Sequence, residues 1–179
     1  MELQRRDAAL NAVADSLRRI TQAIRLSSSV VQDKLGITGA QLFVLQQLAD
    51  QPGASLRELA DRTLTDQSSV SVVVSRVVDA GYVARRISRQ DARRTELTLT
   101  AAGTQLLRRA PALAQTRLMA ALRAVSVREL RITASVLGRV AAAVGSTAEP
   151  APMFFEPASG KRRAAGRKPA PRRGRGKTA

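Results

Sequence analysis

The 179-residue sequence contains neither cysteine nor histidine. Without cysteine the chain can form no disulfide bond and offers no thiol nucleophile or sulfur-based redox sensor. The absence of both residues also removes the common zinc ligands and the histidine general bases of most catalysis at neutral pH. We therefore expect a protein that is not an enzyme and that holds no metal ion and no cofactor.

Long apolar runs and acidic residues are scarce as well. No apolar run approaches the roughly 18 residues that a membrane span requires, and no signal peptide opens the chain, so we expect a cytoplasmic protein. Lysine and arginine number 30 against 14 aspartate and glutamate residues, which gives a formal net charge of +16. This excess favours a polyanionic partner, and the lack of a membrane span favours nucleic acid.

The positive charge is dense toward the C-terminus. Residues 148–179 hold nine of the lysine and arginine residues and two glutamates, in a stretch rich in proline, glycine and alanine. Such a composition cannot bury enough apolar surface to offset the entropy of ordering, so we expect residues 147–179 to be a disordered basic tail. Its segment Arg173-Gly174-Arg175-Gly176 is similar to a minor-groove AT-hook core, but the usual following proline is missing, which favours non-specific phosphate contact.

Apolar residues near the N-terminus follow a 3,4,3,4 spacing, which places them on one seam of a helix. The members of this seam are Leu10, Val13, Leu17, Ile20 and Ile24. Gly36 fits a C-terminal stop. From the spacing alone the seam is either a core-facing stripe, which is slightly favoured, or a subunit interface.

Three further helix starts have a serine or threonine followed three residues later by glutamate or glutamine. This is the capping-box signature, in which two side chains satisfy N–H groups of the first helical turn. The pairs are Thr38 with Gln41, Ser55 with Glu58 and Ser126 with Glu129. They predict helices over about 38–50, 55–62 and 126–144, and Pro52-Gly53 separates the first two.

The segment from 66 to 80 combines a valine-rich composition, typical of strands, with a helical spacing. The apolar side chains at 70, 73, 74, 77 and 78 fit a helical stripe, whereas strict alternation fails at 72–74. We therefore predict a helix that Thr65 or Asp66 caps at its start and Ala80-Gly81 ends. Its free side would carry short polar and positively charged side chains.

Two extended pieces, about 82–87 and 95–100, flank a polar connection and predict a β-hairpin. The hairpin region contains five arginines and one acid, which are Arg85, Arg86, Arg89, Arg93, Arg94 and Asp91. The arginines either keep an exposed hairpin soluble or bind a polyanion. Thr100 caps a further helix from near Ala101, and Pro111 should kink or split that helix.

This order of elements is that of a winged helix-turn-helix, so we expect a mainly α fold with a two-stranded β-hairpin wing. Such a unit places the second helix of the pair in the major groove of DNA, and arginines of the wing can reach the minor groove or the phosphates. We assign residues 38–100 to the DNA-binding region and residues 1–37 and 101–146 to a helical dimerisation region. The residues expected to contact DNA are Gln67, Ser68, Ser69, Ser71, Val72, Ser75, Arg76, Arg85, Arg86, Arg89, Asp91, Arg93 and Arg94.

Over residues of about 10–144 the sequence resembles the MarR family of bacterial transcription regulators. The likeness is sharpest at SLRELADR, at SSVSVVVSRVVDAGYVARR and at the wing motif, where D-x-R precedes a strand that ends in L-T-x-x-G. The wing motif consists of Asp91, Arg93, Leu97, Leu99, Thr100 and Gly103. In this family the wing arginine inserts into the minor groove and the aspartate orients it, so the resemblance implies these roles for Arg93 and Asp91.

The resemblance also implies a repressor that binds a palindromic operator as a homodimer, which favours the subunit-interface interpretation of the N-terminal seam. Many relatives bind a small, often aromatic or anionic molecule between the dimer helices and the DNA-binding unit. Such a regulator would be nucleoid-associated within the cytoplasm. The alternative function is an architectural or non-specific DNA- or RNA-binding protein whose basic tail does most of the binding.

Overall fold

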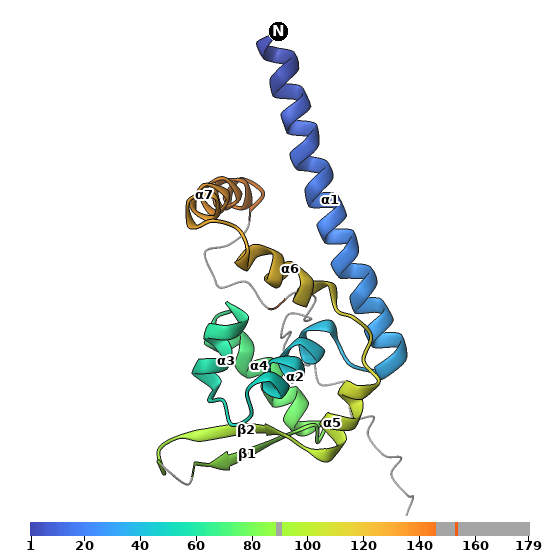
Figure 1. Cartoon of the computed structure of the whole chain (residues 1–179), viewed down its shortest axis with the longest axis vertical. Helices are drawn as coiled ribbons and strands as arrows, with labels where there is room; N and C mark the ends of the chain where they lie inside the picture. The colour runs from blue at the N-terminus through green and yellow to red at the C-terminus, as the bar shows by residue number, and fades with distance from the viewer. Residues whose placement is uncertain (89–90, 146–152, 154–179) are drawn as a thin grey trace, which may run out of the picture.

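The computed structural model describes residues 1–88, 91–145 and 153. The first element, α1 (Glu2–Leu35), is 34 residues long and ends at Gly36. Gly36 adopts the left-handed conformation with φ 71°, and its N–H donates to the carbonyl of Gln32. This confirms the glycine stop, because a residue without Cβ takes this conformation at little cost. The N-terminal part of α1 extends away from the other elements (Figure 1).

Three helices follow: α2 (Gly39–Asp50), α3 (Leu56–Thr63) and α4 (Gln67–Asp79). The capping boxes predicted at Thr38 and Ser55 are both present, with each N-cap side chain and its partner exchanging hydrogen bonds. The valine-rich segment is a helix, as its spacing predicts, because the valine stripe supplies a continuous apolar face for packing against α2 and α3.

The wing consists of β1 (Val83–Ile87) and β2 (Thr95–Leu99), which pair antiparallel from Val83 opposite Leu99 to Ile87 opposite Thr95. Ala54, in the loop before α3, pairs with the outer side of β2 at Leu97. The wing is therefore joined through backbone hydrogen bonds to the loop between α2 and α3.

The predicted break at Pro111 divides the next helical segment into α5 (Ala101–Arg108) and α6 (Ala114–Arg123). Proline lacks the N–H that a continuous helix would need at this point. The last described helix is α7 (Val127–Ala143), and it begins with the third predicted capping box, Ser126 with Glu129.

The hydrophobic core is centred on α2. Its largest fully buried side chains come from α1 to α4 and are Val31, Leu42, Phe43, Val44, Leu45, Leu48, Leu59, Val70, Val73, Val74 and Val77. Of residues 146–179 the structure describes Met153 alone, whose side chain is buried with this core. The segment Arg173-Gly174-Arg175-Gly176 lies outside the described residues.

The L-T-x-x-G end of the wing motif has a packing explanation. Thr100 caps α5 by accepting the N–H of Gly103, and its own hydroxyl donates to the carbonyl of Gly81 at 2.7 Å. The first turn of α5 thereby lies on the turn after α4. A Cβ atom on Gly103 would lie 2.2 Å from the backbone oxygen of Tyr82, so only glycine fits this approach.

The N-terminal seam divides into two parts in the protomer. Leu10, Val13, Leu17 and Ile20 are 67%, 55%, 39% and 42% exposed, whereas Ile24 is 3% exposed. At the level of Ile24, α1 already packs on the rest of the chain, since the Ser27 hydroxyl three residues on accepts the N–H of Ala114 in α6. Ile24 therefore belongs to the protomer interior, whereas the other four members of the seam are left open to solvent.

The helix α7 has no buried residue within the protomer. Its exposed apolar side chains are Val127, Ile132, Val136, Leu137 and Val140. Within the described ranges, no helix has the length and apolar character needed to cross a membrane.

Candidate nucleic-acid interface

The helix α4 buries one face and presents the other. The valines at 70, 73, 74 and 77 are buried, and this fixes which side chains point outward. Gln67 and Ser68 are exposed, and the remaining predicted contacts on this helix are partly exposed. The latter are Ser69, Ser71, Val72, Ser75 and Arg76. The predicted α4 residues therefore lie outside the core, on a surface of short side chains that a DNA groove could approach closely.

The N-terminus of α4 carries a fixed negative charge. The carboxylate of Asp66 accepts hydrogen bonds from the Ser68 hydroxyl at 2.6 Å and from the Ser68 N–H at 3.0 Å. These bonds, the hydroxyl bond first, lower the pKa of Asp66 below its ordinary value of 3.8. An ionised carboxylate here occupies the position where a helix N-terminus would otherwise attract a phosphate. The start of α4 is therefore a poor site for an anion, in contrast to the wing with its exposed arginines.

The wing and α4 share one surface through Arg85. This residue lies on β1, and its guanidinium donates to the Ser75 hydroxyl on α4 at 3.2 Å. Arg86 and Arg93 are both exposed on the hairpin. Arg89 lies outside the described residues.

Asp91 organises the turn at the wing tip. Its side-chain Oδ1 accepts the backbone N–H of Arg93 at 2.9 Å, and its backbone oxygen accepts the N–H of Arg94 at 2.9 Å. The carboxylate therefore fixes the main chain that carries Arg93. In this structure the Asp91 carboxylate contacts the backbone of Arg93, whereas the resemblance implies that it orients the side chain of Arg93.

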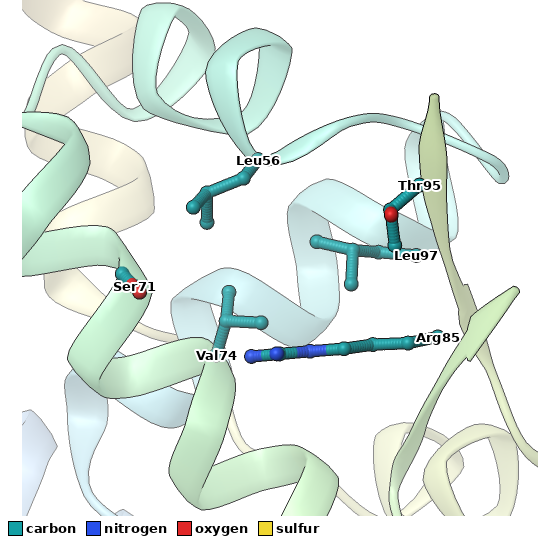
Figure 2. Close-up of a pocket in the computed structure, with 6 residues that line it drawn as sticks. All are labelled: Leu56, Ser71, Val74, Arg85, Thr95 and Leu97. Atoms are coloured by element: carbon teal, nitrogen blue, oxygen red, sulfur yellow. The ribbon is translucent and has the colours of Figure 1, made fainter. Parts of the chain in front are cut away.

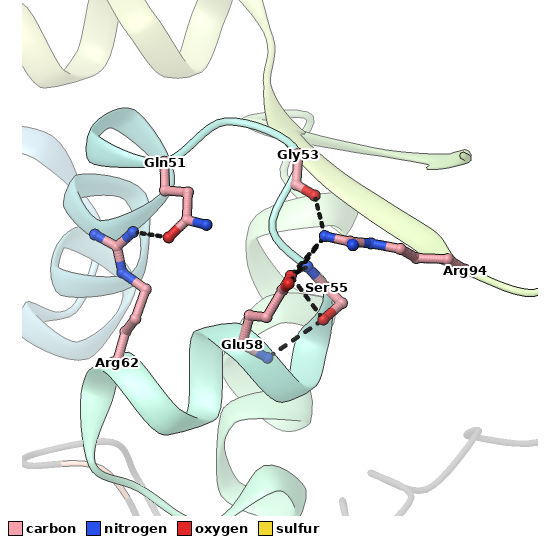
Figure 3. A network of polar contacts seen from close by, with 6 residues as sticks. All are labelled: Gln51, Gly53, Ser55, Glu58, Arg62 and Arg94. Carbon is pink, nitrogen blue, oxygen red and sulfur yellow. Dashed lines mark hydrogen bonds and ion pairs between the residues drawn. The ribbon is translucent and has the colours of Figure 1, made fainter. Parts of the chain in front are cut away.

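Arg94 is held differently from the other wing arginines. Its guanidinium donates to both carboxylate oxygens of Glu58, at 3.0 and 2.8 Å, and to the carbonyl oxygen of Gly53 at 3.4 Å (Figure 3). Glu58 is also the capping-box partner of Ser55. The sequence indicates the capping role of Glu58 but gives no signal of its contact with Arg94, because the two residues are 36 positions apart.

Figure 2 shows a cavity between the wing and the helix pair α3 and α4. Its volume is about 290 Å³, and the guanidinium of Arg85 extends into it from β1. The lining residues are Leu56, Ser71, Val74, Arg85, Thr95 and Leu97. An occupant of this cavity would touch α4 and the wing at once.

A second, more open cavity of about 300 Å³ lies between α1 and the start of α6. Apolar residues such as Leu26 and Val30 line it together with Ser27 and Arg117. This combination of an apolar wall and one cation suits a small aromatic or anionic molecule. The described residues contain no group of three or more acidic side chains that could hold a metal ion.

The chain is similar in sequence to known proteins. Residues 35–94 match the sequence profile of the MarR family. The HTH-type transcriptional repressor Rv2887 of Mycobacterium tuberculosis is 34% identical over 125 residues, which cover 68% of this chain and 90% of the relative. The HTH-type transcriptional repressor MdtR of Bacillus subtilis is 30% identical over 97 residues, or 54% of this chain and 63% of the relative. Among solved structures, the PcaV transcriptional regulator from Streptomyces coelicolor is 26% identical, with a TM-score of 0.47 over 75% of this chain and 98% of that one.

Proposed function

The chain belongs to the MarR family of transcriptional regulators, and from this premise we propose that it is a ligand-responsive repressor that binds a palindromic operator as a homodimer. The observation that carries the proposal is the bond from Arg85 to Ser75. It joins the arginine-bearing wing to the polar face of α4, so that both can meet one stretch of duplex. Such a protein would act on the nucleoid in the cytoplasm.

In the proposed complex, α4 enters the major groove and the wing follows the adjacent minor groove. The short side chains Ser68, Ser71 and Val72 allow close approach of the helix, and the valine suits an apolar contact with a thymine methyl group. Arg93, exposed beside the organised turn at Asp91, is the arginine placed in the minor groove, where a narrow groove concentrates negative potential.

The proposed homodimer covers the two apolar faces that the protomer leaves open. Leu10, Val13, Leu17 and Ile20 form the first face, on α1, and the exposed apolar side chains of α7 form the second. Apolar area of this extent at helical spacing is unusual on a monomer and typical of a subunit interface. A two-fold axis would then place the two α4 helices on half-sites about 10 base pairs apart.

Light scattering at micromolar concentration tests the dimer. We expect twice the mass of the chain for the natural protein and a shift toward monomer for the double variant Leu17→Glu and Ile20→Glu. The matched variant Arg18→Glu, on the same stretch of α1 but outside the seam, should remain dimeric. A monomeric natural protein would contradict the proposal.

For the ligand we propose the cavity between α1 and the start of α6, since its apolar lining together with Arg117 suits a small aromatic anion. Benzoate, a minimal aromatic anion, serves as a probe in a thermal-shift titration and in operator binding. Stabilisation and weaker operator binding are expected for the natural protein, and both should be reduced in Arg117→Ala. A response lost in Arg85→Ala and kept in Arg117→Ala would move the site to the cavity beside the wing.

The function as a whole is tested by a genomic footprint of the protein. An operator-specific repressor should protect a few sharp sites with two-fold symmetry. Broad coverage without symmetry would favour the alternative of an architectural protein bound through its basic tail.

A further inference from the structure

We propose that Glu58 and Arg94 are a positioning pair that sets how the wing tip presents Arg93 to DNA. The inference rests on the proposed wing interface and goes beyond it, because it assigns a DNA-binding role to an acidic residue on α3. It also gives Arg94 a role that differs from direct phosphate contact.

The geometry of the pair is that of a clamp between α3 and the tip of the hairpin. One guanidinium nitrogen of Arg94 lies within hydrogen-bond distance of both oxygens of the Glu58 carboxylate. The carbonyl of Gly53, in the loop before α3, accepts from the same nitrogen at 3.4 Å. Three acceptors on the α3 side thus converge on a single side chain of the wing (Figure 3).

Glu58 is itself held rigidly at the start of α3. Its carboxylate accepts the backbone N–H of Ser55 at 2.7 Å and the Ser55 hydroxyl at 2.9 Å. These bonds and the nearby Arg94 lower the pKa of Glu58, so the group is ionised near neutral pH. The capping box therefore supplies a fixed anion to which the wing can be tied.

The base of the wing is anchored without this pair. The N–H of Gly53 donates to Leu97 at 3.0 Å, and the N–H of Leu97 donates to Ala54 at 2.9 Å. Leu97 and Ala54 are both buried. Loss of the ion pair should therefore leave the hairpin folded and attached, and should release its tip alone.

The backbone of Arg94 also forms the hydrogen bonds that close the turn at the wing tip. Its carbonyl accepts the N–H of Ser88 at 2.8 Å, and its N–H donates to the carbonyl of Asp91. Arg93 is its neighbour in the chain, inside the turn that Asp91 caps. Fixing the side chain of Arg94 on α3 thus limits how far Arg93 can swing away from the groove.

The direction in which DNA affinity changes distinguishes a positioning role of the pair from an effect of charge alone. The two side chains of the pair are 42% and 39% exposed, and an ion pair so exposed contributes little to folding stability. Removal of the negative charge of Glu58 near a polyanion should strengthen DNA binding by charge alone. If the pair positions the wing tip, the same change should weaken binding.

The experiment measures operator affinity at fixed salt for Glu58→Gln, Arg94→Gln and the double variant. Glutamine can also close a capping box, so Glu58→Gln preserves the start of α3, and Arg94→Gln leaves that box untouched. We expect each single variant to lose roughly threefold to tenfold in affinity, and the double variant to lose no more than the worse single one. The thermal unfolding midpoint should stay close to that of the natural protein.

A matched control removes a different acid, which lies on the hairpin itself. Glu96→Gln, on β2, should leave operator affinity equal or slightly higher, because it changes the charge without touching the clamp. The second readout is how much operator affinity Arg93→Ala removes in each background. The fold-loss caused by Arg93→Ala should be smaller in the Glu58→Gln background than in the natural protein, since a released tip no longer holds Arg93 in place.

The outcomes separate failure of this inference from failure of the proposed interface. If Arg93→Ala leaves operator affinity unchanged, the wing interface itself is refuted. If Arg93→Ala weakens binding while Glu58→Gln strengthens it or leaves it unchanged, the interface stands and the positioning pair is refuted. Losses that add in the double variant would likewise overturn the pair and make Arg94 an independent phosphate contact.

Discussion

At the scale of single residues, Asp91 is the acid whose place among arginines needs an explanation. Its carboxylate caps the turn that carries Arg93. Charge alone predicts that an acid at a DNA-binding surface weakens binding. A turn geometry fixed by Asp91 can outweigh that repulsion, because screened charges at the surface interact weakly.

The first prediction concerns this residue and its neighbour. Arg93→Ala should cost operator binding on the order of 1–3 kcal/mol, the range for an arginine at the base edges. Asp91→Ala should also weaken binding, and the two losses should be non-additive because Asp91 acts through the chain that carries Arg93. Operator titrations of the singles, the double and the control Arg109→Ala measure this. Tighter binding by Asp91→Ala would identify the hairpin as a solvated charge cluster.

Gly103 carries the second prediction at this scale. A Cβ at this position meets the backbone oxygen of Tyr82, which cannot move without disturbing the junction of α4 and the wing. Gly103→Ala should lower the free energy of unfolding by about 1–3 kcal/mol through overpacking. Denaturant titration measures the loss, with the exposed Gln105→Ala on the same helix as the control, expected within about 0.5 kcal/mol of the natural protein. Equal stability of both variants would show that the contact can relax.

At the scale of elements, α4 and α7 each begin with an ionised capping side chain. Asp66 caps α4 and Glu129 completes the capping box of α7. The hydroxyl of Ser126 is the largest cause of the lowered pKa of Glu129, as that of Ser68 is for Asp66. A lowered pKa means that the folded state prefers the charged form, so each cap stabilises at neutral pH and loses its contribution as the pH falls through the lowered value.

The third prediction follows from this sign. The free energy of unfolding should fall as the pH drops below the ordinary values of 3.8 for Asp66 and 4.5 for Glu129. The double variant Asp66→Asn and Glu129→Gln should show a shallower fall, because these two caps no longer titrate, although Glu58 in the capping box of α3 still does. Urea titrations between neutral pH and pH 3 measure the slopes. Asp79→Asn, which removes no capping bond, is the control and should follow the natural slope.

The elements whose signals are local were predictable from the sequence. A capping box spans four residues and the helical stripe of valines spans nine, so each is visible without knowledge of the fold. Pro111 marked the break between α5 and α6 for the same reason. The extent of α1 was less visible, because its first residues cover no core and so carry no apolar spacing.

Contacts between distant residues were not predictable. Ile24 shares its spacing with Leu17, and a spacing cannot say which part of a seam the protomer covers and which it leaves open. The link between Glu58 and Arg94 depends on the docking of β2 against the loop before α3. The residue types at both positions fit other roles equally well, a cap and a phosphate contact.

At the scale of the whole molecule, the charge of the C-terminal tail adds to that of the DNA-binding region. The fourth prediction is that deletion of residues 148–179 weakens binding to operator and random DNA by similar factors. It should also flatten the dependence of log K on log salt, since fewer counterions are released. Titrations at several salt concentrations measure both. A matched variant that keeps the charge but scrambles residues 173–176 should bind as the natural protein does, and loss of operator preference in it would mean that the segment reads sequence.

The uncovered helix α7 has a consequence for exchange of amide hydrogens with solvent. Amides of α2, inside the core, should exchange only when the protomer unfolds, whereas those of α7 would gain protection from the partner in the proposed homodimer. Dilution of the proposed homodimer should therefore speed deuterium uptake in α7 and in the first half of α1 while leaving α2 unchanged. Amide exchange would then be slowed in α2 by the fold of the protomer and in α7 by dimerisation, which depends on protein concentration.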